Sequence, residues 1–188
     1  YLDFLSGIGV CSPGHCHPSI VQAVSDQAAK LIHVSNYYYI EHRGEVAQLL
    51  SNMLNAYVDE PSPETWKTFF ANSGAEANEC AIKLARLYAR RRTEAAGKDA
   101  ELAPRLIVTL AKSFHGRTLA TLAATAQPAK QEAFQPLPDG FVAVPPNDVA
   151  ALEALFEAQG DQVCAVMVEC VQGESGVHPC TSEFLQAV

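Results

Sequence analysis

Short apolar stretches alternate with helical patterns over most of this sequence. Residues 106–110, 141–144 and 163–168 are rich in aliphatic and β-branched side chains. Such nearly continuous apolar runs are typical of parallel strands that are covered on both faces. The spacing of apolar residues before and between them predicts helices at 74–96 and at about 147–158. We therefore expect an α/β fold with a mainly parallel, doubly wound sheet that is flanked by helices.

The N-terminal part follows a different pattern, which predicts a small separate segment over residues 1–60. A strand or extended stretch is expected at 1–10, and apolar residues at helical spacing predict helices at 18–33 and about 42–56. A large α/β domain is then expected over residues 61–188.

A helix with an open, polar N-terminus is predicted after a short strand at residues 66–70. Ser73 can cap this helix, and Glu76 lies three positions later, as a capping box requires. The small residues Gly74 and Ala75 leave the first N–H groups uncovered at the positive end of the helix dipole, where a phosphate binds readily. A capped helix without a ligand is the alternative, but the polar stretch is more specific than a cap alone requires.

Composition argues against several classes of function. The formal net charge is −8 and the pI is near 5.2, which argues against a nucleic-acid-binding surface. No apolar run has the length of a membrane span, and no signal peptide is recognised, so we expect a cytoplasmic protein. The six scattered cysteines are expected to be reduced, although their even number also allows disulfides. We expect no metal site, because the adjacent His15, Cys16 and His17 do not aim at one ion.

Four ordered stretches resemble the class III (ω-amino acid) aminotransferases, which carry pyridoxal phosphate on the fold type I architecture. They cover residues 1–18, 72–79, 113–118 and 168–174. The last stretch is similar to the family's Glu-Pro-x-Gln-Gly-Glu motif, with Cys170 at the position of the usual proline. The resemblance implies pyridoxal 5′-phosphate as the cofactor, small-molecule substrates and a homodimer.

The resemblance also implies which residues bind the cofactor. The start of the capped helix is expected to bind the phosphate through Ser73, Gly74 and Ala75. Phe114 is expected to stack on the cofactor ring, and His115 is expected to lie beside it as a packed, hydrogen-bonded neighbour. For Phe114 taken alone, a core aromatic side chain is the alternative.

Two glutamates and two residues near the N-terminus complete the implied site. Glu169 matches an acid at a strand end beside the cofactor, and Glu174 matches a glutamate that changes partners as different substrates enter. Both are expected to be catalytic, and Glu174 is also expected to contact substrate. A glutamate after an apolar strand needs a partner, and a solvated turn is the alternative for Glu169. Ile8 and Tyr39 align with residues that line the substrate site.

The lysine that bonds to the cofactor in this family has no match among the six lysines of the sequence. Lys112 fits a similar local pattern, but it stands two residues before Phe114, whereas the family's lysine comes much later in the chain. Relatives with this order of motifs are considerably longer. We therefore interpret the sequence as the N-terminal half of an enzyme, truncated at its C-terminus and expected to be inactive by itself.

Within the family, residues 35–41, 135–138 and 146–153 look most like the acetylornithine aminotransferases. This resemblance implies an exchange of the amino group between N-acetylornithine and 2-oxoglutarate in arginine biosynthesis. Ile8 stands where ornithine aminotransferases tend to have a tyrosine. An aliphatic residue at this position suits an acylated substrate or a substrate that is bound differently. Succinylornithine, ornithine and 4-aminobutyrate aminotransferases are the alternatives in the family, and a non-catalytic module that keeps the fold is the alternative outside it.

Overall fold

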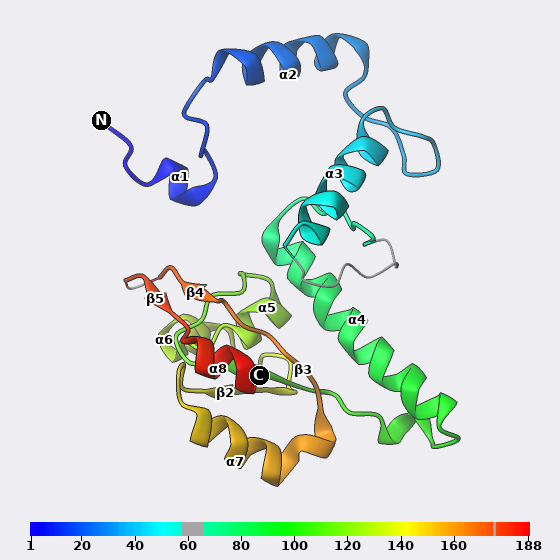
Figure 1. The fold of residues 1–188 in the computed structure, drawn as a ribbon, viewed down its shortest axis with the longest axis vertical. Coiled ribbons are helices and arrows are strands. Elements are labelled where there is room, and N and C mark those ends of the chain that lie inside the picture. Colours follow the sequence, from blue (N-terminus) through cyan, green and yellow to red (C-terminus); the bar gives the residue numbers. More distant parts are fainter. Residues whose placement is uncertain (58–65, 175) are drawn as a thin grey trace. The chain divides into compact units, whose positions relative to one another are not determined.

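The chain separates into two compact units, Tyr1–Thr68 and Phe69–Val188, in a computed structural model. The structure describes residues 1–57, 66–174 and 176–188, and Figure 1 shows the order of their helices and strands. The predicted boundary between residues 60 and 61 lies outside the described residues.

The regular elements of the first unit, where it is described, are helices joined by loops. It contains α1 (Ser6–Gly9), α2 (Pro18–Lys30) and α3 (Arg43–Asn55). Proline occupies the first position of α2, where its missing N–H costs no helical hydrogen bond. The two long helices predicted for this part of the chain are confirmed, each slightly shorter than expected.

The strand predicted at residues 1–10 is wrong. Ser6, Gly7 and Ile8 have positive φ angles of 50°, 60° and 60°, which interrupts an extended backbone. The carboxylate of Asp3 closes the turn, because it accepts a hydrogen bond from the N–H of Gly7 at 2.7 Å. A polar side chain that binds nearby backbone groups competes with strand formation in this way.

The second unit contains a parallel sheet of three strands in the order β2-β1-β3. These strands are β1 (Leu106–Leu110), β2 (Phe141–Val144) and β3 (Val163–Val166). Both β2 and β3 pair with β1 in parallel, which confirms the predicted α/β class. The last strand ends two residues earlier than predicted. A separate antiparallel pair consists of β4 (Val171–Gln172) and β5 (His178–Pro179).

The helices of this unit follow the predicted alternation with strands (Figure 1). They are α4 (Gly74–Ala95), α5 (Leu119–Ala124), α6 (Pro128–Gln131), α7 (Val149–Gln159) and α8 (Ser182–Ala187), with short 3₁₀ turns at Ala100–Leu102, Glu132–Phe134 and Gly160–Gln162. The helices predicted at 74–96 and 147–158 are confirmed as α4 and α7.

The main hydrophobic core lies between the sheet and the last two helices. Val108 and Leu110 of β1 pack with Val144 of β2, Leu152 of α7 and Phe184 of α8. Each of these side chains is almost completely buried, and burial of one such side chain stabilises the fold by about 1.5–3 kcal/mol. This core packs the sheet against α7 and α8. The loops that follow the strands lie outside it.

The strand predicted at residues 66–70 is also wrong. A strand exists only where a neighbour satisfies its backbone groups, and none of the strands in the described part of the chain pairs with this stretch. The contact that the structure shows for Trp66 is a side-chain hydrogen bond, in which its indole N–H donates to Asn55 Oδ1 at 2.8 Å.

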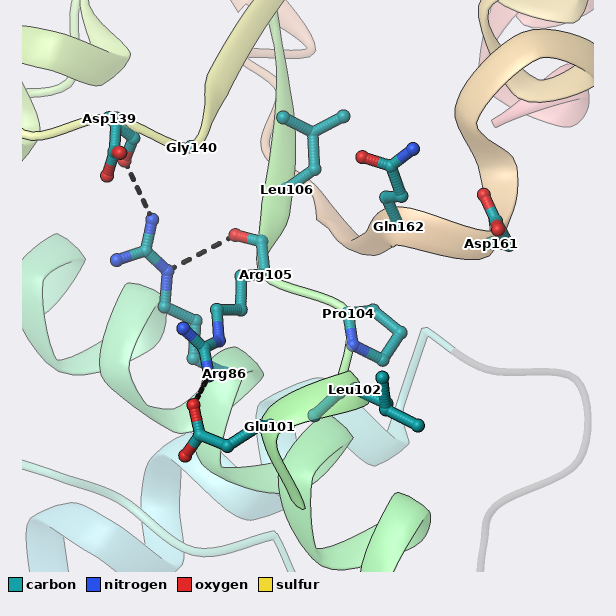
Figure 2. A pocket seen from close by; sticks show the side chains of 11 residues that line it. Arg86, Glu101, Leu102, Pro104, Arg105, Leu106, Asp139, Gly140, Asp161 and Gln162 are labelled. Carbon is teal, nitrogen blue, oxygen red and sulfur yellow. Dashed lines mark hydrogen bonds and ion pairs between the residues drawn. The ribbon is translucent and has the colours of Figure 1, made fainter. Parts of the chain in front are cut away.

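A pocket of about 510 Å³ opens at the amino-terminal edge of the parallel sheet (Figure 2). Arg86 of α4 projects into it and donates two hydrogen bonds, from Nε to Arg105 O at 3.3 Å and from Nη2 to Asp139 O at 3.1 Å. Its guanidinium also lies 5.4 Å from the centroid of the Phe141 ring. Arg86 therefore ties α4 to the backbone just before β1 and just before β2.

No helix among the described residues is long and apolar enough to cross a membrane. No group of three or more His, Cys, Asp and Glu side chains in residues 1–57, 66–174 and 176–188 is placed to hold a metal ion. The six cysteines are free thiols.

Candidate functional site

The loops after β1 and β3 meet at the carboxyl-terminal edge of the sheet. The backbone N–H of Phe114, which follows β1, donates to Glu169 Oε2 at 2.8 Å, and Glu169 follows β3. Ligands of parallel α/β sheets bind at this edge of the sheet. The structure thus brings together two residues that are 55 positions apart in the chain.

The loop after β1 also contacts the first turns of α4. Asn78 donates from Nδ2 to the carbonyl oxygen of His115 at 2.8 Å. Gly116 lies so close to the helix that a Cβ atom at this position would be 2.8 Å from Ala75 Cβ. The start of α4 and the loop after β1 therefore form one surface.

The N-terminus of α4 is capped by a variant of the predicted capping box. Ser73 Oγ accepts a hydrogen bond from Glu76 N at 3.2 Å, as predicted. The Glu76 carboxylate, however, accepts from Asn72 N at 2.7 Å rather than from Ser73 N. The N–H groups of Ser73, Gly74 and Ala75 donate to no other group in the described part of the chain. These three donors at the positive end of a long helix are suited to an anion.

Two cations lie beside the Phe114 ring, and one of them also binds a carboxylate. Lys130 Nζ lies 5.3 Å and Arg117 Cζ 5.7 Å from the ring centroid. Lys130 also forms an ion pair with Glu174, and Gln127 Nε2 donates to the same carboxylate at 2.9 Å. The hydrogen bond from Lys130, followed by that from Gln127, holds the pKa of Glu174 below its ordinary value.

Glu169 has the opposite electrostatic environment. Burial raises the pKa of its carboxyl group above the ordinary value, and the negative charge of Glu174 acts in the same direction. The hydrogen bond from Phe114 N opposes this shift only in part. The two glutamates that the resemblance singles out therefore differ, because Glu174 is stabilised as an anion and Glu169 is easier to protonate.

His115 is buried, with 5% of its surface exposed, and its Nε2 atom has no hydrogen-bond partner among the described residues. Its backbone N–H donates to Thr125 Oγ1 at 2.9 Å, so the backbone is held while one ring nitrogen is left unpaired. Burial lowers the pKa of the imidazole and favours the neutral form. A buried polar atom without a partner costs free energy, and a polar ligand atom at Nε2 would recover part of that cost.

A His115→Gln variant is expected to lose less stability on acidification than the wild type. Burial lowers the pKa of His115 in the folded protein. The neutral side chain therefore makes its full contribution to the free energy of unfolding above the pKa of the unfolded chain, near 6.5. It is lost as the pH falls below that value towards the folded pKa, since the unfolded chain then binds the proton first. Urea midpoints of the wild type and the variant at pH 7.5 and 5.5 measure the difference. The exposed His33→Gln variant is the control, and a wild-type acid slope in His115→Gln would contradict the expectation.

The structure brings only part of the predicted site together. Ile8 and Tyr39 belong to the first unit, where both side chains are exposed. Their assignment as substrate contacts stays a prediction. Lys112, already rejected as the family's lysine, is an exposed residue with a φ of 63° just after β1.

Sequence reasoning missed the side chains that complete the site. Asn78 lies within a stretch that carries the resemblance, so its motif could have pointed to it. Gln127 and Lys130 belong to no motif that we identified, and they lie 47 and 44 residues from their partner Glu174. No local spacing in the sequence signals these contacts.

The geometry fits a phosphate-bearing aromatic ligand. Three N–H donors offer an anion site, the Phe114 ring offers a stacking surface, and His115 Nε2 offers one unpaired polar atom. The polar donors come from α4 and from the loop after β1, which are in contact through Asn78. This arrangement agrees with the comparisons to known proteins.

Several sequences similar to this chain are named acetylornithine aminotransferases. The enzyme of Caldanaerobacter subterraneus subsp. tengcongensis is 48% identical over 188 residues, which is all of this chain and 43% of that protein. The enzyme of Methanocaldococcus jannaschii is 46% identical over 188 residues, again all of this chain and 42% of that protein. The chain thus spans about two fifths of the length of the relatives that it matches.

Solved structures agree with the sequence comparison. The ornithine aminotransferase from Toxoplasma gondii has a TM-score of 0.80 and 27% identity, and the match covers all of this chain and 40% of that one. The acetylornithine aminotransferase from Elizabethkingia anophelis has a TM-score of 0.69 and 35% identity, with all of this chain and 41% of that one covered.

The family model described as aminotransferase class-III matches residues 1–188. The match extends over the whole chain and includes every segment of the candidate site. The chain therefore belongs to the class III aminotransferases, a family whose cofactor is pyridoxal phosphate.

Proposed function

We propose that the whole protein is an acetylornithine aminotransferase that exchanges an amino group between N-acetylornithine and 2-oxoglutarate in arginine biosynthesis. The observation that carries this proposal is the 46–48% identity, over the full chain, to several proteins of that name. The convergence of the α4 start, Phe114 and Glu169 at one edge of the sheet supports it. Because the chain matches only part of these relatives, the activity is proposed for the whole protein.

The described residues would hold pyridoxal phosphate in a defined way. The N–H groups of Ser73, Gly74 and Ala75 would bind its phosphate, and Phe114 would pack against its ring. When bound, the cofactor supplies a carbonyl carbon that accepts amino groups and a ring that withdraws electrons. His115 Nε2 is free to hydrogen-bond to a polar atom of this ligand, and the neutral imidazole adds no charge.

The two glutamates of the site have different roles: one positions a neighbouring residue, and the other contributes a charge. Glu169 binds the backbone of Phe114, so it sets the position of that ring relative to β3. Its raised pKa makes this carboxyl group easier to protonate than an exposed glutamate, which suits proton exchange in a partly closed site. Glu174 stays ionised beside Lys130 and contributes a negative charge where substrates enter.

The first unit is proposed to contribute to the substrate site and to a homodimer. Ile8 and Tyr39 would line the substrate entrance. Large apolar side chains are exposed along α2 and α3 of this unit: Ile20, Val21, Val24, Val46, Leu49, Leu50, Met53 and Leu54. Exposed apolar surface on this scale is typical of an interaction surface, and it supports a dimer of the whole protein.

A transamination assay with the purified whole protein tests the proposal. We expect glutamate to form from 2-oxoglutarate with N-acetylornithine, and we expect slower reactions with N-succinylornithine, ornithine and 4-aminobutyrate. The 188-residue chain assayed alone is expected to be inactive, because none of its lysines matches the one that bonds to the cofactor. Faster turnover of another amino donor would reassign the substrate, and no turnover by the whole protein would favour a non-catalytic module.

A further inference from the structure

Lys130 places a positive charge at the candidate site that no sequence motif assigns. It lies in α6, its Nζ is 5.3 Å from the centroid of the Phe114 ring, and it forms an ion pair with Glu174. The side chains of Lys130 and Glu174 are only 26% and 37% exposed. An ion pair in this partly buried setting is screened less by salt than a fully exposed pair.

A second side chain from the same short segment holds Glu174 in this position. Gln127 Nε2 donates to Glu174 Oε2 at 2.9 Å and to the carbonyl oxygen of Ser113 at 2.9 Å. Gln127 therefore links the Glu174 carboxylate to the loop after β1. Lys130 Nζ binds the same oxygen, Glu174 Oε2. The positive charge of Lys130 therefore lies beside a carboxylate that Gln127 also holds in place.

The charges around Phe114 come close to balance only when Lys130 is included. Glu169 and Glu174 are near enough for the negative charge of Glu174 to act on Glu169. Arg117 and Lys130 are the cations within 6 Å of the Phe114 ring in the described residues. Without Lys130, the negative charge of Glu174 would have no ion-pair partner from α6. It would then repel an anionic ligand that enters this site more strongly.

We propose that Lys130 is a positioning residue for Glu174 and thereby determines how well the site accepts a substrate with two carboxylates. By neutralising Glu174, Lys130 removes a repulsion that acts on a dianionic 2-oxo acid. A zwitterionic amino donor without net charge, such as N-acetylornithine, is affected much less. This inference rests on the proposed function and names a residue that sets its substrate preference.

The kinetic test is a Lys130→Met substitution in the whole holoenzyme. We expect KM for 2-oxoglutarate to rise by roughly five- to tenfold at low ionic strength, and less at high salt. KM for N-acetylornithine should change by no more than about twofold, because the uncompensated charge repels mainly the dianion. Lys130→Arg keeps the positive charge and should restore the wild-type KM. Lys98→Met removes a charge just after α4 and is the matched control.

A second readout tests the ion pair without catalysis. Trace acetylation of the cofactor-free whole protein, followed by mass spectrometry, reports the reactivity of each lysine amine. Lys130 should react more slowly than the exposed Lys98, and Glu174→Gln should raise the Lys130 rate several-fold while the Lys98 rate stays constant.

The two readouts separate this inference from the proposed function. If the whole protein shows no transamination but Lys130 is protected by Glu174, the proposed function fails and the positioning role stands. Equal acetylation of Lys130 in the wild type and Glu174→Gln would overturn the pairing. Equal increases of KM for both substrates in Lys130→Met would overturn the role in substrate preference.

Discussion

Replacement of Gly116 by alanine is expected to destabilise the protein by about 2–4 kcal/mol. The residue has a φ of +141°, a conformation that L side chains rarely adopt, and a new Cβ would lie 2.5 Å from Thr121 Oγ1 and 2.8 Å from Ala75 Cβ. The hydroxyl of Thr121 cannot easily move away, since it accepts a hydrogen bond from Thr118 N at 3.1 Å in the cap of α5. Relief of the clash would therefore separate the loop after β1 from α4.

Urea unfolding of the whole protein and of the Gly116→Ala variant measures this loss. Gly44→Ala is the matched control, because Gly44 has no atom within 4 Å of a new Cβ and lies inside α3. Alanine there should leave stability unchanged or raise it slightly. A loss below about 1 kcal/mol in Gly116→Ala would show that the loop and the helix can separate at little cost, which contradicts the close packing.

A Gly74→Pro variant is expected to fold normally but to bind pyridoxal phosphate about ten- to a hundredfold more weakly. Gly74 is the first residue of α4, where proline fits a helix, and a Cβ there meets no atom within 4 Å. The preceding Ser73 is extended, with φ of −156° and ψ of 164°, as a residue before proline prefers. The substitution thus removes one N–H donor from the proposed phosphate site and changes little else.

Titration of pyridoxal phosphate into cofactor-free whole protein, followed by absorbance, measures the affinity. Circular dichroism verifies that the variant is folded. Gly74→Ala is the control, because it keeps the N–H group and should bind the cofactor as tightly as the wild type. A folded Gly74→Pro variant with unchanged affinity would place the phosphate elsewhere and leave the polar start of α4 as a simple helix cap.

The sequence predicted the central part of the fold because each strand of the parallel sheet is an apolar run that is buried by its neighbours. It did not predict the backbone at residues 1–10, where four consecutive residues, from Ser6 to Gly9, have positive φ angles that interrupt an extended chain. Hydrophobicity carries no information about such a turn. It also predicted a strand at 66–70. The apolar side chains are present there, but no strand in the described part of the chain pairs with this stretch.

The candidate site was predictable only where its residues lie in local motifs. The capped start of α4 and the Phe114–His115 pair stand out in the sequence because their residue types are unusual in that order. The contacts of Glu174 with Gln127 and Lys130 depend on how the chain between α5 and α6 folds back over the loop after β1. No periodicity specifies that return, so the charge beside Phe114 was found only in three dimensions.

The number of residues in α4 between Asn78 and Arg86 cannot change without loss of contacts at one end of the helix. Asn78 fixes the start of the helix to the loop after β1, and Arg86 fixes it to the opposite edge of the sheet. A helix rises by about 1.5 Å per residue, so these anchors lie roughly 12 Å apart along its axis. One inserted residue between them would turn the anchors by about 100° relative to each other, so both could not keep their partners. The length of the helix between these anchors therefore sets where the N–H groups of the proposed phosphate site lie relative to the sheet.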